Sequence, residues 1–265
     1  MSGNRDRRSG DDAGPAPSRS DAVRVVRGRA ADVDADRAAT ATLLDRAATA
    51  TLLDRAAAAG RVGVRAWTPA RQVAFGPRDV RDRGFERARR AARRRGYRVV
   101  ERRVGGRAVA YTGRTVAFAR AAPVADARRG LDERYESVVG AVVDALGGLG
   151  ADVERGEPAD SFCPGTHSVR VRGGGKVAGV AQRVREGAAL VAGCVLVDDA
   201  AAQRSVLGPV YDALGVPFDP DAVGSVAAAG GAADPERVAR ALEAALVGGR
   251  PTRTTPASAV AERTS

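Results

Sequence analysis

The chain has 265 residues, 44% of them hydrophobic, and a formal net charge of +11, which allows one sizeable domain with a buried core. No apolar run approaches the roughly 20 residues that a membrane span needs. One histidine and two cysteines are too few for a metal site of ordinary spacing or for a disulfide framework, so we expect no metal, free thiols and a cytoplasmic protein. The positive charge indicates an acidic partner.

The first part of the chain predicts a leader, a strand and a helix. Residues 1–21 lack the apolar core of a secretory signal, and we expect them to be disordered. Residues 22–28 predict a short strand, and a helix opens near Asp34. The sequence ATATLLDRA stands at 39–47 and again at 48–56. Nine residues turn a helix by about 900°, so both leucine pairs cannot share one face. We interpret the repeat as a local duplication in which only one copy packs.

The rest of the chain predicts alternating strands and helices. We expect strands over 61–67, 71–76, 97–103, 108–112, 115–121 and 187–198, and a hairpin of 167–172 with 176–184 around a triple glycine. We expect helices over 79–95, 131–150, 199–214, 220–228 and 235–247. This order indicates a mixed α/β or α+β domain over 22–248, followed by a disordered tail over 249–265.

The densest positive charge lies between residues 78 and 103. This stretch interleaves arginine with Asp79, Asp82, Glu86 and Glu101, and it lacks the regular aromatics of proteins that bind single-stranded nucleic acid. A solvated helix face is the interpretation we favour. An acidic protein domain would suit the charge equally well, and nucleic acid is the less favoured partner.

Two stretches place glycines beside a cation, at 101–113 and 173–182. Glycines let backbone N–H groups approach an anionic ligand, although a tight strand connection and a hairpin turn explain the same pattern. Three ordered blocks resemble the signatures of the lipoate–protein ligase A and octanoyltransferase family, which shares its fold with biotin ligase catalytic domains. They are RAWTPARQVAFG (65–76), RRVGGRAV (102–109) and KVAGVAQR (176–183).

The resemblance implies an α+β catalytic domain of the biotin/lipoate-ligase type, a mixed sheet flanked by helices. It implies that Lys176, the only lysine, contacts the acyl carbonyl and, in ligases, the adenylate phosphate. A compact ammonium suits a single oxygen at the end of a narrow tunnel better than a guanidinium fork does. The other binding residues that it implies are Arg103 at the nucleotide or carboxyl end, Gly105 and Gly106 in a close backbone turn, Arg107, Ala108, Val109 and Ala110 along the pocket, and Gly179 and Ala181 beside the aliphatic chain.

Some residues depart from the family pattern or extend it. The His-Asp that usually follows the second block is replaced by Tyr111 and Thr112. One octanoyltransferase branch forms an acyl thioester on a cysteine before the lysine strand, and Cys163 lies in that loop as a candidate nucleophile. The alternative is that Cys163 is an ordinary loop residue. We expect Cys194 in the core and His167 in a surface or structural role.

The resemblance favours an ATP-dependent lipoate–protein ligase, which would use ATP and Mg²⁺ to form an acyl-adenylate of lipoate or octanoate. Its acceptor would be a lysine of an apo lipoyl domain or of a glycine-cleavage H-like protein. The first alternative is a cysteine-dependent transferase that takes octanoyl or lipoyl groups from acyl carrier protein or from a lipoylated protein. A basic nucleic-acid-binding protein is the second alternative. A separate accessory subunit is one explanation for the lack of an accessory domain in the sequence.

Overall fold

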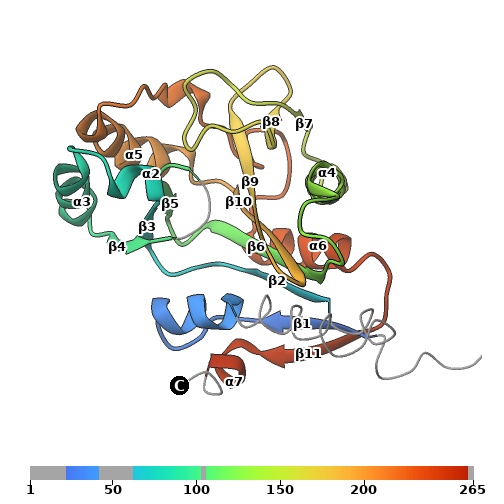
Figure 1. Ribbon diagram of the computed structural model, residues 1–265. Coiled ribbons are helices and arrows are strands. Elements are labelled where there is room, and N and C mark those ends of the chain that lie inside the picture. The colour runs from blue at the N-terminus through green and yellow to red at the C-terminus, as the bar shows by residue number, and fades with distance from the viewer. Residues whose placement is uncertain (1–21, 42–61, 103–105, 262–265) are drawn as a thin grey trace, which may run out of the picture.

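Two β-sheets with helices packed on them make up the described part of the chain, residues 22–41, 62–102 and 106–261 of a computed structural model (Figure 1). The larger sheet has the strand order β11-β1-β2-β6-β10-β9-β8-β7, and the smaller has the order β4-β3-β5. The larger sheet contains β1 (Val23–Arg27), β2 (Gly63–Trp67), β6 (Thr115–Pro123), β7 (Val153–Arg155), β8 (Ser168–Val171), β9 (Lys176–Arg185), β10 (Ala188–Leu196) and β11 (Thr252–Pro256). The smaller contains β3 (Gln72–Phe75), β4 (Arg98–Glu101) and β5 (Val109–Tyr111).

Four longer helices pack on these sheets in two pairs. One pair, α4 (Leu131–Gly147) and α6 (Pro235–Val247), packs on the larger sheet, and the other, α3 (Phe85–Arg94) and α5 (Ala200–Leu214), packs with the smaller one. Shorter elements are α2 (Pro77–Val80), the 3₁₀ turn η2 (Pro220–Ala222), α7 (Ala257–Ala261) and a helical stretch over 33–41. Among these helices, none is both long enough and apolar enough to cross a membrane.

The core has two main parts, one for each pair of helices. Val142 and Leu146 of α4 and Leu242 of α6 are buried against Phe118 and Val195 of the larger sheet. Each such side chain contributes about 1.5–3 kcal/mol when it leaves water. The second part joins α3, α5 and the smaller sheet, and it also includes Cys194 and Leu196 of β10. The sheets are therefore held beside each other through β10.

The ends of α6 show how local sequence sets an element. The Asp234 carboxylate accepts a hydrogen bond from the Glu236 N–H, and Pro235 occupies the first helical turn, where its missing N–H costs nothing. Gly248 ends the helix with φ of +68°, a conformation that glycine adopts without strain. The predicted bounds of 235–247 are confirmed.

The predicted α+β fold with a mixed sheet is confirmed, as are the hairpin of β8 with β9 and the predicted strands from β1 to β6. Strand β7 was absent from the prediction. The helix predicted over 79–95 is wrong in extent, because α2 and α3 are separate. Gly84 lies between them as the N-cap of α3, and a Cβ there would stand 1.9 Å from the Ala213 carbonyl oxygen, so only glycine fits where the chain passes α5.

The helix predicted over 220–228 is also wrong. Only the η2 turn is helical, and Val223 then pairs with Lys176 beside β9. The Gly224 N–H donates to the Lys176 carbonyl at 2.9 Å. A Cβ on Gly175 would lie 2.6 Å from the Gly224 nitrogen, which explains the last glycine before the lysine.

The tail predicted as disordered over 249–265 is ordered in part. Residues 252–256 form β11, which pairs in parallel with β1, and α7 follows. Threonines suit a strand, and β1 would otherwise be an unpaired sheet edge. The leader over 1–21 and most of the tandem repeat, from residue 42 on, lie outside the described residues.

Candidate active site

A cavity of about 810 Å³ is lined by residues of both sheets, by the helical stretch 33–41 and by the loop 162–168. Its apolar lining includes Val109, Ala117, Phe118, Phe162, Val180 and Leu190. Both the size and the apolar character are typical of small-molecule sites.

Small residues of β9 and β10 line the cavity and leave it open. Gly179 and Ala181, predicted to leave room for an aliphatic chain, both line it. Gly193 lies opposite on β10, and a Cβ there would stand 2.4 Å from the Gly179 carbonyl oxygen and 2.5 Å from the Phe118 ring. These strands therefore depend on glycine for their close approach.

Cys163 also lines the cavity, and its backbone is in a conformation that is rare for a residue other than glycine. Its φ is +44°, in the left-handed region, and its N–H donates to the Tyr211 hydroxyl at 2.6 Å. Its Sγ accepts hydrogen bonds from the Arg102 guanidinium at 3.2 Å and from the Arg107 N–H at 3.4 Å. The surrounding structure therefore holds the thiol among donors.

These donors change the acidity of the thiol. Burial raises the pKa of Cys163, but the Arg102 charge, the Arg107 N–H, the Lys176 charge and the Gly106 N–H outweigh it, and the pKa lies below its ordinary value. A thiol with a lowered pKa is a better source of thiolate, which is the nucleophilic form of cysteine.

Cys194 has the opposite character. It is buried in the second core, as predicted, and it also lines the cavity. Burial raises the pKa of Cys194 to about 12, so this thiol stays protonated at neutral pH. The two cysteines are therefore chemically distinct, and only Cys163 fits a nucleophile.

Lys176 lies behind the Cys163 loop. It is 1% exposed, and its Nζ donates to both oxygens of the Glu157 carboxylate at 3.1 and 3.0 Å. It also donates to the Phe162 and Cys163 carbonyls at 3.1 and 2.9 Å. The ammonium thus fixes the loop that carries the thiol, and Lys176 is not among the cavity-lining residues. Its contact with an acyl carbonyl stays a prediction.

The second sequence block contributes only in part to the cavity. Arg103 and Gly105 lie outside the described residues. Gly106 and Val109 line the cavity, whereas the Arg107 guanidinium pairs with Asp79 at 3.2 Å. Ala108 and Ala110 are buried in the second core, where the Ala108 carbonyl accepts from Tyr211 and the Ala110 carbonyl accepts from Gln203.

Three functional residues escaped the sequence prediction. Arg102 stands beside the predicted Arg103 in the same motif, so the motif itself was the available signal. Glu157 binds Lys176, 19 residues away in sequence, and Tyr211 binds Cys163, 48 residues away. No local pattern marks either of them.

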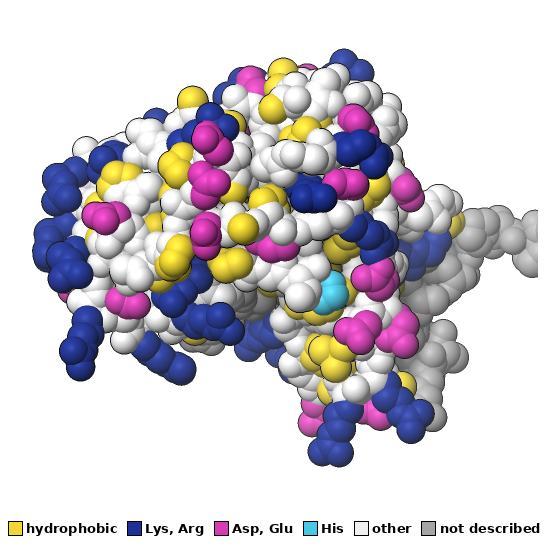
Figure 2. Space-filling model, turned by 90° about the horizontal axis from the view of Figure 1, so that it is seen from above, with side chains coloured by type: hydrophobic (Ala, Val, Ile, Leu, Met, Phe, Trp, Pro, Cys, Tyr) yellow, Lys and Arg dark blue, Asp and Glu magenta, His cyan; other side chains and the backbone are white. Residues whose placement is uncertain are grey.

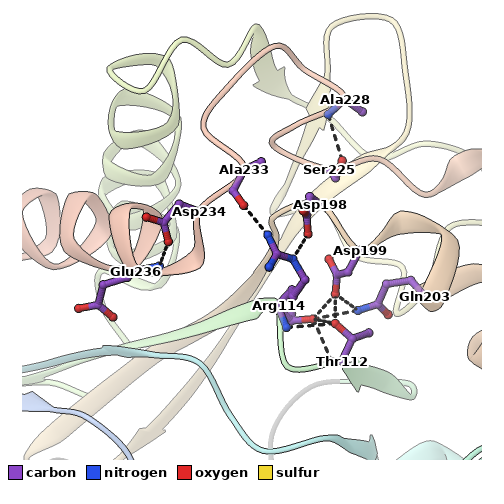
Figure 3. Close-up of polar contacts among 11 residues, drawn as sticks. Thr112, Arg114, Asp198, Asp199, Gln203, Ser225, Ala228, Ala233, Asp234 and Glu236 are labelled. Atoms are coloured by element: carbon purple, nitrogen blue, oxygen red, sulfur yellow. Dashed lines mark hydrogen bonds and ion pairs between the residues drawn. The ribbon is translucent and has the colours of Figure 1, made fainter.

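The two residues that depart from the family pattern, Tyr111 and Thr112, have different surroundings. Tyr111 lines the cavity, and burial raises the pKa of its hydroxyl. Thr112 belongs to a hydrogen-bond network beside the cavity (Figure 3), in which its hydroxyl donates to the Asp199 carboxylate. Thr115 and Gln203 donate to the same oxygen of Asp199 at 2.6 and 3.2 Å. The network joins β6 to the start of α5, so Thr112 supports the fold near the site.

His167 stacks on Tyr135, with ring centroids 3.7 Å apart and planes 5° from parallel. Both rings line the cavity. His167 therefore packs against a neighbouring ring, as a structural residue does, and also lines the cavity. Within the described ranges, no group of three or more His, Cys, Asp or Glu side chains is arranged to hold a metal ion.

Comparison with known proteins first gives the class. The sequence matches the family described as the lipoyl protein ligase A/B catalytic domain over residues 44–245, so the chain belongs to this family. The resemblance seen in the three sequence blocks is thereby confirmed.

Curated relatives match about half of the chain. The chain is 31% identical over 144 residues to an octanoyl-[GcvH]:protein N-octanoyltransferase of Geobacillus kaustophilus, covering 54% of this chain and 50% of the relative. It is 28% identical over 120 residues to a lipoyl-[GcvH]:protein N-lipoyltransferase of Listeria monocytogenes, covering 45% and 43%. The chain thus spans about half the length of these curated relatives.

Solved structures agree in fold. A lipoate-protein ligase A bound with ATP superposes with a TM-score of 0.69 at 18% identity, covering 92% of this chain and 93% of that one. At this identity the likeness concerns the fold alone.

Proposed function

We propose that this chain is an acyltransferase that moves an octanoyl or lipoyl group through a thioester on Cys163 to a lysine of an acceptor protein. The observation that carries the proposal is the Cys163 thiol, which has a lowered pKa and faces an apolar cavity beside Arg102 and two backbone N–H groups. The names of the curated relatives, an octanoyltransferase and a lipoyltransferase, support it.

We infer that the apolar cavity binds the acyl chain. The aliphatic chain would lie along Val180 and Leu190, with Gly179 and Ala181 leaving room beside it. Its carbonyl would face Cys163 at the polar end. We infer that the donor is a glycine-cleavage H protein, because the relatives' names give octanoyl- or lipoyl-GcvH for them, and that it carries the acyl group as an amide on a lysine. Acyl carrier protein, with a thioester, is the other donor we keep.

The chemistry proceeds in two acyl transfers. The Cys163 thiolate attacks the carbonyl carbon of the acyl-lysine, and the carbonyl oxygen becomes an oxyanion. The Arg102 guanidinium and the Arg107 N–H, which now bind the sulfur, are the donors available to that oxyanion. The C–N bond breaks, and the donor lysine leaves as an amine after taking up a proton.

The second transfer reverses these roles. The neutral amine of the acceptor lysine attacks the thioester carbonyl, loses a proton, and the Cys163 thiolate leaves. The lowered pKa of this thiol makes it a better leaving group and a better source of the nucleophilic thiolate. The electropositive surroundings thus serve both halves of the reaction.

The ATP-dependent ligase is the competing function. Arg103, which the resemblance assigns to the nucleotide or carboxyl end, and Gly105 of the close backbone turn lie outside the described part of the chain. A cytoplasmic location and the need for an accessory subunit stay predictions.

Intact-mass analysis tests the proposal. Incubation with octanoylated H protein should add one octanoyl group to the wild-type chain and to Cys194→Ser, and none to Cys163→Ser. Transfer to an apo acceptor should follow the same pattern. Acceptor modification that requires octanoate and Mg-ATP, releases pyrophosphate and survives in Cys163→Ser would instead establish the ligase.

A further inference from the structure

A strongly basic surface formed by α2, α3 and the turn between them is not used by the proposed chemistry. The inner face of α3 is buried through Phe85, Ala88, Ala91 and Ala92, which pack toward α5. Figure 2 shows Lys and Arg side chains gathered at the end of the molecule where α3 lies.

Six exposed arginines of this surface have side chains that make no hydrogen bond or ion pair with any residue that the structure describes. They are Arg78, Arg81, Arg83, Arg90, Arg93 and Arg94, and together we call them the arginine surface. By contrast, Arg87 donates to the Ala213 carbonyl, and Arg89 pairs with Glu86.

The carboxylates nearest in sequence do not neutralise this charge. Asp79 is fully buried and pairs with Arg107, and Asp82 lies 3.7 Å from the same guanidinium. Glu86 is paired with Arg89 at 2.7 Å. The arginine surface therefore presents a local excess of positive charge that is free to meet a partner.

The arginine surface begins at the cavity. Arg78 lines the cavity and also belongs to α2. A Cβ on Gly76, which caps α2, would stand 2.2 Å from the Gly106 carbonyl oxygen. Because Gly106 and Arg107 place their N–H groups toward the Cys163 sulfur, the basic surface continues directly from the reactive end of the cavity.

We propose that the arginine surface docks an acidic carrier protein, the donor or acceptor whose lysine must reach Cys163; this rests on the proposed function. Complementary charge steers encounter and orients the partner, and it acts over about 8 Å at physiological salt. Continuity with the cavity favours such a protein over nucleic acid, since a duplex bound here would cover the site without supplying an amine.

The test compares two double variants of equal charge change. Arg90→Glu/Arg94→Glu reverses two charges of the arginine surface. Arg128→Glu/Arg237→Glu is the matched control, since its two arginines are exposed, their guanidinium groups have no partner among the described residues, and they lie outside α2 and α3. Against octanoylated H protein, we expect kcat/KM of the first variant to fall about tenfold at low salt, with a flatter salt dependence. The control should stay within about twofold of wild type.

A small acyl donor separates docking from chemistry. Acylation of Cys163 by the octanoyl thioester of N-acetylcysteamine should be equal in all three proteins, because this donor needs no docking surface. If wild type is not acylated at all, the proposed function fails. In that case the docking proposal is tested by itself. The Kd for octanoylated H protein is measured with the same double variants made in a Cys163→Ser background.

The Kd should rise about tenfold with Arg90→Glu/Arg94→Glu and stay unchanged in the control. An equal Kd in all variants, or no binding to the parent protein, overturns the docking proposal. So does a gel shift of duplex DNA at physiological salt that the reversal abolishes while carrier binding is unaffected, since that result would assign the surface to nucleic acid.

Discussion

Lys176→Met removes the ammonium that joins Glu157 to the Cys163 loop. Four hydrogen bonds are lost, two to the carboxylate and one each to the Phe162 and Cys163 carbonyls. A carbonyl left without a donor costs about 1–3 kcal/mol, and breaking a fully buried ion pair costs about 3–5 kcal/mol. The Glu157 side chain is 22% exposed and can regain water, so these terms do not add in full. We expect a loss of about 3 kcal/mol.

Urea unfolding at neutral pH measures this loss as a lower midpoint at constant slope. The double variant Glu157→Leu/Lys176→Met should recover part of the stability, because it no longer leaves a carboxylate without its cation. A single-variant loss below about 1 kcal/mol, within the range of a surface pair, would refute the burial argument.

The same substitution should change the thiol. Lys176 is one of the charges that lower the pKa of Cys163, so its removal raises that pKa toward the ordinary value. The rate of alkylation by iodoacetamide follows the thiolate, and its midpoint in wild type should lie below the value of about 8.5 for a free cysteine. Lys176→Met should move the midpoint to higher pH. A midpoint that stays fixed would show that the ammonium does not act on the sulfur.

Other substitutions test the cavity and its supports. Gly76→Ala should destabilise the protein and slow alkylation of the cavity thiol, because its Cβ would stand 2.2 Å from the Gly106 carbonyl oxygen. Gly208→Ala, a helix position with no atom within 4 Å, is the control and should melt at the same or a higher temperature. Arg65→Met should cost about 3–5 kcal/mol in urea unfolding, because it leaves the buried Asp36 carboxylate without its cation. It should also raise KM for the acyl donor, since Asp36 belongs to the cavity wall; normal stability would contradict this assignment.

The sequence was informative where a pattern is local. Alternating valines predicted β1 and β2, and Asp234-Pro235 marked the start of α6. The ordered glycine blocks led to the family, and through it to Gly179 and Cys163 as cavity residues.

The rest depended on contacts between distant segments. At the break between α2 and α3, Gly84 packs against the Ala213 carbonyl of α5, a contact that no periodicity in 79–95 reveals. The partners of Lys176 come from a loop whose path is set by Tyr211, and the order of 252–256 comes from its pairing with β1. Such features arise only when folding brings segments that are distant in sequence into contact.

Strand β11 also has a consequence for self-association. It covers the outer edge of β1, and α7 beyond it places Ala257 and Val260 in one apolar cluster with Ala39 and Leu190. A chain cut at residue 248 would leave the N–H and C=O groups of β1 open to pairing with another molecule. Since Leu190 lines the cavity, the same cut would loosen the cavity wall. Light scattering of the shortened chain should therefore detect aggregation, which we attribute to the exposed edge of β1.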